Sequence, residues 1–166
     1  MSKSEENLKE AFAGESQANR KYLAFADKAE KEGFPQAARL FRAAAEAETV
    51  HAHNHLRALK MILNTKENLQ AAVNGEIHEF KNMYPEMIKA AEMEGSKEAR
   101  QSFFLANEVE KIHARLYQNM LDGLETAGRG EYPYYVCPFC GFTAEKEAPE
   151  TCPVCGAKGK AFKKIG

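Results

Sequence analysis

Residues 107–117 read NEVEKIHARLY, and Glu110 and His113 in this stretch form a Glu-x-x-His pair. Residues three apart lie on the same face of an α-helix, so both side chains can reach one metal ion. The same pair recurs at Glu48 and His51, in the stretch ETVH. Two such pairs in one chain indicate two helices that turn metal-binding faces toward a shared interior.

The chain around these pairs has the composition of long helices. Residues 4–126 contain only two prolines and are rich in Ala, Glu, Lys, Leu and Met. Gly33 followed by Pro35, and Gly95 followed by Ser96, are typical of a helix end and the next helix start. Pro85 is expected to kink the helix that contains it. We therefore predict four amphipathic helices, over about residues 4–32, 35–63, 68–94 and 96–126.

Every predicted helix has a glutamate within its apolar stripe. A carboxylate buried alone costs several kcal/mol, and pairing or metal coordination relieves that cost. Two histidines cannot neutralise so many carboxylates, whereas two metal cations can. Di-iron carboxylate bundles combine one Glu from each of two helices with Glu-x-x-His from each of the others. Here each helical hairpin contains one such Glu and one Glu-x-x-His. The predicted ligands are Glu15, Glu48, His51, Glu76, Glu110 and His113, with Glu79 as an extra candidate.

Two tyrosines follow the unpaired glutamates by about two helical turns. Tyr22 follows Glu15, and Tyr84 follows Glu76. Either tyrosine can serve as a core residue or can hydrogen-bond a ligand carboxylate, so both are candidate site residues.

The C-terminal stretch VCPFCGFTAEKEAPETCPVCG, residues 136–156, contains two Cys-x-x-Cys pairs. Four thiolates at this spacing predict a tetrahedral metal site, formed by Cys137, Cys140, Cys152 and Cys155. The spacing does not decide between zinc, which would be structural, and iron, which would carry electrons. Since residues from Tyr132 onward are too few for an apolar core, a metal must hold them together. The predicted domains are residues 1–128 and 132–166, separated by Gly128 and Gly130.

Composition narrows the possible partners and location. The formal net charge of -1 gives no electrostatic basis for binding nucleic acid or an anionic membrane. All four cysteines fall in the two pairs, which indicates metal binding in a reducing compartment rather than disulfides. No apolar run approaches the ~18 residues of a membrane span, and the N-terminus lacks the apolar region of a signal peptide. We expect a cytoplasmic protein without a membrane segment.

The order of these motifs resembles the rubrerythrin family over nearly the whole chain. The resemblance lies in AFAGESQANRKYLAFADKAEKEGFPQAARLFRAAAEAETVHA, NLQAAVNGEIHEFKNMYPEMIKAAEMEG and NEVEKIHARLY, followed by YVCPFCGF and CPVCG. It implies an all-α four-helix ferritin-like bundle with a small C-terminal rubredoxin-like metal-knuckle domain. It also implies two non-haem irons in the bundle and one iron in the tetrathiolate site. In this family one iron is thought to shift between a histidine and a glutamate, which by position are His51 and Glu79.

The activity implied by the resemblance is that of a peroxidase in oxidative-stress defence. Hydrogen peroxide would be reduced to water with electrons passed through the tetrathiolate iron. The electron donor would be rubredoxin or an NAD(P)H-dependent reductase. A neighbouring di-iron site favours iron over zinc in the cysteine site, because peroxide reduction consumes two electrons. The alternatives are a ferroxidase or iron-handling ferritin-like protein, and a non-enzymatic zinc-ribbon interaction protein.

One feature departs from the ferritin-like pattern, in which a long crossover joins the second and third helices. Here only LNTKEN, residues 63–68, lies between them. Six residues span at most ~20 Å, whereas a helix of about 25 residues is ~37 Å long. The chain therefore has a plain up-down topology, or its first two helices pair with the last two of another chain. We favour the swapped homodimer, with each di-iron site drawn from both chains.

Overall fold

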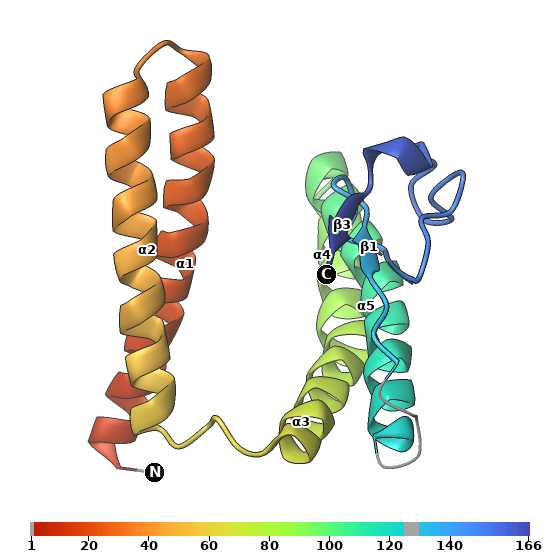
Figure 1. Ribbon diagram of the computed structural model, residues 1–166, viewed down its shortest axis with the longest axis horizontal. Helices are drawn as coiled ribbons and strands as arrows, with labels where there is room; N and C mark the ends of the chain where they lie inside the picture. Colours follow the sequence, from red (N-terminus) through yellow and green to blue (C-terminus); the bar gives the residue numbers. More distant parts are fainter. Residues whose placement is uncertain (1, 125–129) are drawn as a thin grey trace. The chain divides into compact units, whose positions relative to one another are not determined.

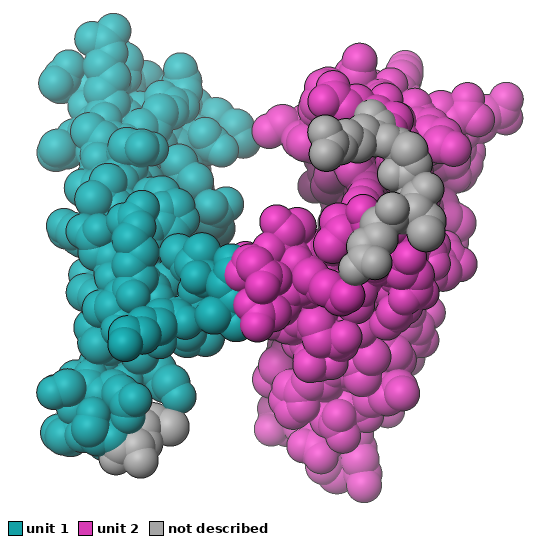
Figure 2. Space-filling view, turned by 60° about the horizontal axis from the view of Figure 1, so that its bottom comes forward, with its two compact units in different colours: residues 1–63 teal, residues 64–166 magenta. Residues whose placement is uncertain are grey.

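The computed structural model describes residues 2–124 and 130–166. The chain divides by its contacts into two compact units, residues 1–63 and residues 64–166, which are coloured separately in Figure 2. The first is a hairpin of two helices, and the second pairs a bent helix with a straight one and carries a small sheet (Figure 1). None of the helices in these described ranges is long and apolar enough to cross a membrane.

The first unit consists of α1 (Lys3–Lys31) and α2 (Pro35–Ala58). Ser2 and Glu5 form a capping box at the start of α1. Gly33 takes a left-handed conformation after the last turn, which glycine adopts without steric cost, and Pro35 opens α2. The most buried contacts between the helices come from small residues, a cluster of Ala26, Ala29 and Ala38 with Phe41 packed against it.

The second unit begins with α3 (Thr65–His78), the π-helical turn η1 (Glu79–Met83) and α4 (Tyr84–Met93), which together make one bent helix. Pro85 lies in the first turn of α4, and the π turn that ends at Met83 interrupts the regular α-helix near the predicted kink. The amide of Tyr84 bonds to the carbonyl of Glu79, five residues back, so one extra residue is accommodated. The straight helix α5 (Lys97–Gly123) returns alongside.

Two predicted boundaries in the link between the units were wrong. The second helix ends at Ala58 rather than near residue 63, because Lys60 adopts a positive φ of 55° and breaks the helical path. The third helix starts at Thr65 rather than near Asn68, since Asn64 and Glu67 form a capping box there. The fourth helix ends at Gly123, and the last residues predicted for it, together with Gly128, lie outside the described ranges.

The four-cysteine region contains three short antiparallel strands, in the order β2-β1-β3. They are β1 (Tyr134–Val136), β2 (Thr143–Glu145) and β3 (Lys163–Ile165), with a 3-10 turn η2 (Gly159–Ala161) before β3. This small sheet packs on α5. A methyl group placed on Gly141, at the end of the first cysteine loop, would lie 3.7 Å from Cγ1 of Val109. The sequence prediction of long helices followed by a metal-knuckle domain is therefore confirmed.

Candidate metal centres

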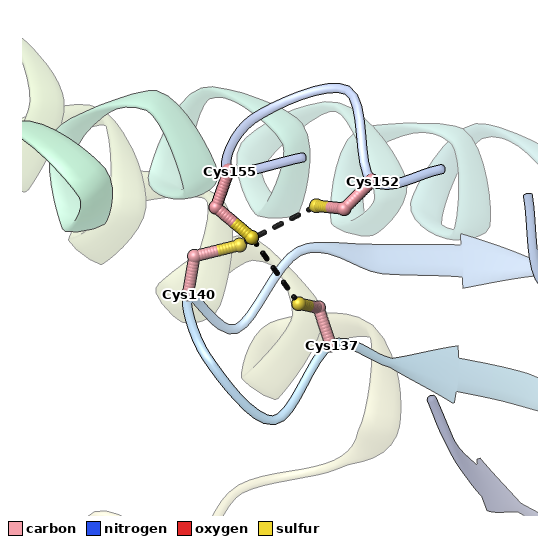
Figure 3. A group of neighbouring side chains, drawn as sticks. All are labelled: Cys137, Cys140, Cys152 and Cys155. Atoms are coloured by element: carbon pink, nitrogen blue, oxygen red, sulfur yellow. Dashed lines mark hydrogen bonds between the residues drawn. The ribbon is translucent and has the colours of Figure 1, made fainter. Parts of the chain in front are cut away.

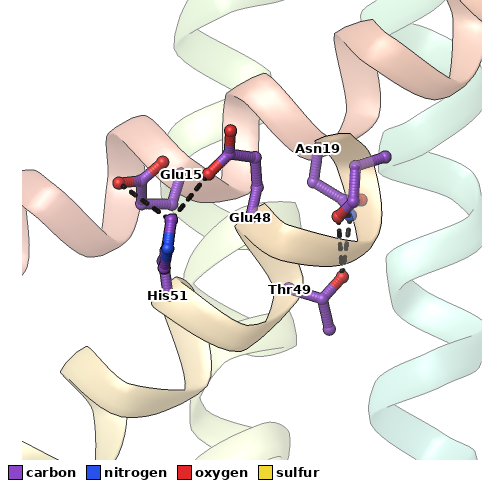
Figure 4. A network of polar contacts seen from close by, with 6 residues as sticks. Glu15, Asn19, Glu48, Thr49 and His51 are labelled. Atoms are coloured by element: carbon purple, nitrogen blue, oxygen red, sulfur yellow. Dashed lines mark hydrogen bonds and ion pairs between the residues drawn. The ribbon is translucent and has the colours of Figure 1, made fainter. Parts of the chain in front are cut away.

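The first carboxylate–histidine group lies on the α1–α2 hairpin. Glu15 comes from α1, and Glu48 and His51 come from successive turns of α2 (Figure 4). The three residues each offer a ligand atom, and these atoms all lie within 4.8 Å of one another. Nδ1 of His51 is 2.8 Å from Oε2 of Glu48 and 3.8 Å from Oε1 of Glu15. The three side chains thus converge on a space suited to one cation.

The second group repeats this arrangement in the other unit. Glu76 comes from α3, and Glu110 and His113 come from α5; their ligand atoms are again within 4.8 Å of one another. Nδ1 of His113 is 2.7 Å from Oε2 of Glu110 and 4.0 Å from Oε1 of Glu76. The structure therefore brings together the predicted ligands of each hairpin, three in each unit.

The electrostatics of the second group favour a bound cation. Burial, and then the charge of Glu110, raise the pKa of Glu76 to about 7. Burial and Glu110 also raise the pKa of Glu79. These carboxylates repel one another in the absence of a positive charge, and a divalent cation would reverse that effect. Carboxylate and imidazole donors in this number fit the iron of a di-metal carboxylate site.

Glu79 and the two candidate tyrosines have different surroundings. Glu79 is not part of the three-residue group, although Glu110 and His113 both influence its pKa. Burial and the charges of Glu79, Glu110 and Glu76 raise the pKa of Tyr84, so its phenol stays protonated. Both tyrosine rings pack on aromatic neighbours. The ring centroid of Tyr22 is 6.4 Å from that of Phe25 and 6.2 Å from that of Phe41, and that of Tyr84 is 6.4 Å from that of Phe103. Their roles as ligand or catalytic residue stay predictions.

The four cysteines point toward one another at the end of the sheet (Figure 3). The Sγ atoms of Cys137 and Cys155 are 3.6 Å apart, as are those of Cys140 and Cys152. A disulfide would need about 2.05 Å. A regular tetrahedron with edges of this length places its centre about 2.2 Å from each corner, close to the metal–sulfur bond of a tetrathiolate site. All four are free thiols, so the geometry fits a single tetrahedral metal.

Several polar residues beside these groups were not assigned a role by sequence. Asn19 is buried one turn from Glu15 and donates from Nδ2 to the carbonyl of Ala45 at 2.7 Å and to Thr49 at 2.9 Å. Asn107 is buried one turn before Glu110. Within residues 2–124 and 130–166, the Oδ1 atoms of Asn19 and Asn107 are buried without a hydrogen-bond partner. The available signal was a polar residue on an apolar stripe, the same signal that found the glutamates.

A cavity of about 610 Å³ lies between α5 and the small sheet. His113, Tyr117, Tyr134 and Thr143 line it together with apolar residues. Burial and the charges of Glu76 and Glu110 raise the pKa of Tyr117, which lies one turn beyond His113. Thr143 had no sequence signal at all, because it reaches α5 only through the packing of the sheet.

Comparison with known proteins agrees with this geometry. The family described as rubrerythrin matches residues 6–121, and the rubrerythrin rubredoxin-like domain matches residues 135–163. Rubrerythrin-2 of Clostridium acetobutylicum is 41% identical over 170 aligned residues, which cover 93% of this chain and 92% of that protein. Nigerythrin of Nitratidesulfovibrio vulgaris is 35% identical, with 90% of this chain and 80% of that protein covered.

Solved structures give the same result. The partially reduced state of nigerythrin superposes with a TM-score of 0.60 at 33% identity, covering 99% of this chain and 88% of that chain. The two carboxylate–histidine groups and the four cysteines fit the family's di-iron centre and rubredoxin-like iron. The chain belongs to the rubrerythrin family.

Proposed function

We propose that the protein is a non-haem di-iron peroxidase, which reduces hydrogen peroxide to water in oxidative-stress defence. The observation that carries the proposal is the packing of the four-cysteine loop on α5. Gly141, next to Cys140, lies against Val109, next to Glu110. An electron-transfer domain placed beside metal-binding residues suits a reaction that repeatedly consumes electrons. A ferroxidase, which takes its electrons from ferrous iron itself, has no need of such a domain.

The reaction converts one peroxide, two electrons and two protons into two waters. When bound, a reduced di-iron centre would supply the two electrons, and an iron held by the four cysteines would replace them one at a time. The residues that would hold the two metals in this chain are Glu15, Glu48, His51, Glu76, Glu110 and His113. Burial and the charges of Glu79, Glu110 and Glu76 raise the pKa of Tyr84, so it keeps its proton and is the proposed proton source. Glu79 is the proposed ligand that exchanges with His51.

We further propose that the site is completed in a swapped homodimer. Each hairpin contributes three ligands, and the first hairpin buries mainly alanines while leaving larger apolar side chains exposed. Leu40 is 69% exposed and Val50 is 51% exposed. The link also contains three consecutive apolar residues whose relative exposure is above one half, namely Met61, Ile62 and Leu63. Three exposed apolar residues in a row are unfavourable in water, so a partner surface is needed to cover them.

The proposed function also includes an electron donor, a cellular location and a role for each domain. The electron donor is rubredoxin or an NAD(P)H-dependent reductase, and the location is the cytoplasm. The division into domains 1–128 and 132–166 assigns peroxide chemistry to the helices and electron transfer to the C-terminal part.

The test is an anaerobic mixing experiment on protein of known metal content. The iron-loaded protein is reduced, mixed with hydrogen peroxide, and followed by the visible absorption of the tetrathiolate iron. Rapid reoxidation, with one peroxide consumed per two electrons, supports the peroxidase. A tetrathiolate iron that stays reduced after peroxide addition, or a cysteine site that holds only zinc, contradicts it. Accumulation of a mineral core on addition of ferrous iron and oxygen would instead identify an iron-handling protein.

A further inference from the structure

His113 makes polar contacts on both sides of its ring. Its Nδ1 faces the carboxylates of Glu110 and Glu76, at 2.7 and 4.0 Å. Its Nε2 is 3.0 Å from Oγ1 of Thr143, on strand β2 of the four-cysteine domain. One imidazole therefore joins the metal-binding face of α5 to a residue that is 30 positions away in the sequence.

The direction of this hydrogen bond follows from the other contact of Thr143. Its Oγ1 is 3.1 Å from the carbonyl oxygen of Gly141, and a carbonyl can only accept. The single hydroxyl proton of Thr143 is thus donated to Gly141, and Oγ1 accepts the N–H of His113 Nε2. Without a metal, Nδ1 donates its own proton to Oε2 of Glu110, because a carboxylate only accepts. A bound metal would replace that proton, and with the other proton kept on Nε2 the lone pair of Nδ1 would face the metal.

We propose that Thr143 is a positioning residue, which holds His113 with Nδ1 directed to the metal and so raises the metal affinity of the α3–α5 half of the di-iron site. This role goes beyond electron transfer, because the four-cysteine domain then also supports the geometry of the helical centre. The proposal rests on the metal-binding part of the proposed function and is independent of the peroxidase activity.

The acceptor of Thr143 is held by the cysteine loop itself. Gly141 has a φ of +87°, a conformation that side chains rarely adopt. Its amide donates to the carbonyl of Cys137 at 3.0 Å, and the amide of Cys137 donates to the carbonyl of Phe142 at 2.9 Å. The loop that carries two metal-binding thiolates therefore fixes the carbonyl of Gly141, and through it the hydroxyl of Thr143.

The equivalent histidine of the first hairpin lacks this support. Nδ1 of His51 faces Glu48 and Glu15 as Nδ1 of His113 faces its own carboxylates. Among the described residues, however, no side chain or carbonyl forms a hydrogen bond with Nε2 of His51. The contact of Thr143 is thus specific to the α3–α5 half and is not a general requirement of the Glu-x-x-His spacing.

The test compares two substitutions at one position. Thr143→Val keeps the shape of the side chain and removes the hydroxyl, whereas Thr143→Ser keeps the hydroxyl. Cobalt(II) is titrated into each protein against a competing chelator, with the four-cysteine site loaded first and followed by its thiolate absorption. An intact thiolate band and an unchanged unfolding temperature show that the variant is folded.

We expect Thr143→Val to weaken one of the two helical cobalt sites about ten- to a hundredfold, the range found for lost outer-sphere partners of ligand histidines. Thr143→Ser should bind within about threefold of the original protein, since the same hydrogen bond is available. Thr151→Val, an exposed threonine of the same domain, should leave both affinities unchanged.

Three results would overturn the proposal. The first is a folded Thr143→Val protein with unchanged affinity at both helical sites. The second is a Thr143→Ser protein as impaired as Thr143→Val, which would assign the effect to packing. The third is an original protein without two helical cobalt sites. A protein that binds cobalt as expected but does not reduce peroxide would refute only the proposed activity.

Discussion

The two halves of the candidate di-iron site share a local geometry and differ in what surrounds it. In both, a histidine Nδ1 lies 2.7–2.8 Å from the glutamate one turn before it. The side chain of His51 is nevertheless 53% exposed, whereas that of His113 is 26% exposed and bonded to Thr143. The comparison teaches that helical spacing creates the ligand group, while packing from elsewhere in the chain determines its burial and rigidity.

The difference is consistent with the ligand exchange that the family resemblance implies. A histidine held on both sides is suited to stay on its metal. A histidine held on one side can leave it, and His51 is the one that by position would exchange with Glu79.

Removing a ligand from the buried half should have the largest effect. Glu110→Ala is expected to lower helical iron content and peroxide turnover by at least about a hundredfold, because ligand loss exceeds the cost of losing an outer partner. Iron analysis and stopped-flow absorption measure both quantities, and the tetrathiolate band should persist. Glu108→Ala is the matched control, since Glu108 pairs with Lys111 on the same helix. Full turnover in Glu110→Ala would contradict the ligand assignment.

Mixing two variant chains, each with a ligand removed from a different hairpin, tests whether each di-iron site is shared between chains. A Glu48→Ala chain and a Glu110→Ala chain are each expected to be inactive as homodimers. In a swapped dimer, the mixed species has one site with both defects and one with none. Random mixing by co-expression should therefore restore about a quarter of the original activity. If each site is built from one chain, mixing restores nothing, and the swapped arrangement is wrong.

The charge of the buried half predicts a pH dependence of stability. The pKa of Glu76 is about 7 in the folded protein and near its ordinary value of 4.5 in the unfolded chain. Between these values the folded state holds the extra proton, so stability falls as pH rises. Protein with empty helical sites should melt a few degrees lower at pH 8 than at pH 5.5, as measured by circular dichroism. Glu76→Gln should reduce this difference, and Glu86→Gln, at an exposed position of α4, should not.

Removing the hydroxyl of Tyr84 or Tyr22 should have the smallest effect on peroxide turnover. The loss should again be greater in the α3–α5 half. Tyr84→Phe is expected to lower peroxide turnover about three- to tenfold, because water can replace the lost proton donor in part. Iron content should not change. Tyr22→Phe keeps the ring packing against Phe25 and Phe41 and is expected to lower turnover less. Equal losses in the two variants would remove the functional distinction between the halves.

Local sequence was sufficient for the number and order of the long helices and for the proximity of the carboxylates and histidines within each hairpin. Glycine and proline positions marked the hairpin turns because their backbone preferences act over a few residues. Glu-x-x-His predicted both histidine contacts, because three-residue spacing on a helix fixes side-chain proximity without help from the rest of the chain. The Cys-x-x-Cys pairs predicted a tetrahedral sulfur site by residue type and spacing, although the contacts between Cys137 and Cys155 and between Cys140 and Cys152 come from folding of the two loops together. The predicted end of α2 was wrong because Lys60 adopts an uncommon conformation, and the predicted start of α3 was wrong because Asn64 and Glu67 form a capping box.

The differences between the α1–α2 group and the α3–α5 group of candidate ligands come from tertiary packing. The contact of Thr143 with His113 joins residues 30 positions apart, and no local pattern encodes it. The raised pKa of Glu76 depends on burial and on Glu110 from another helix. Sequence determined which side chains can bind metal, because that depends on residue type and spacing. Packing between distant segments determined how firmly each is held, because burial and second contacts arise only when those segments meet.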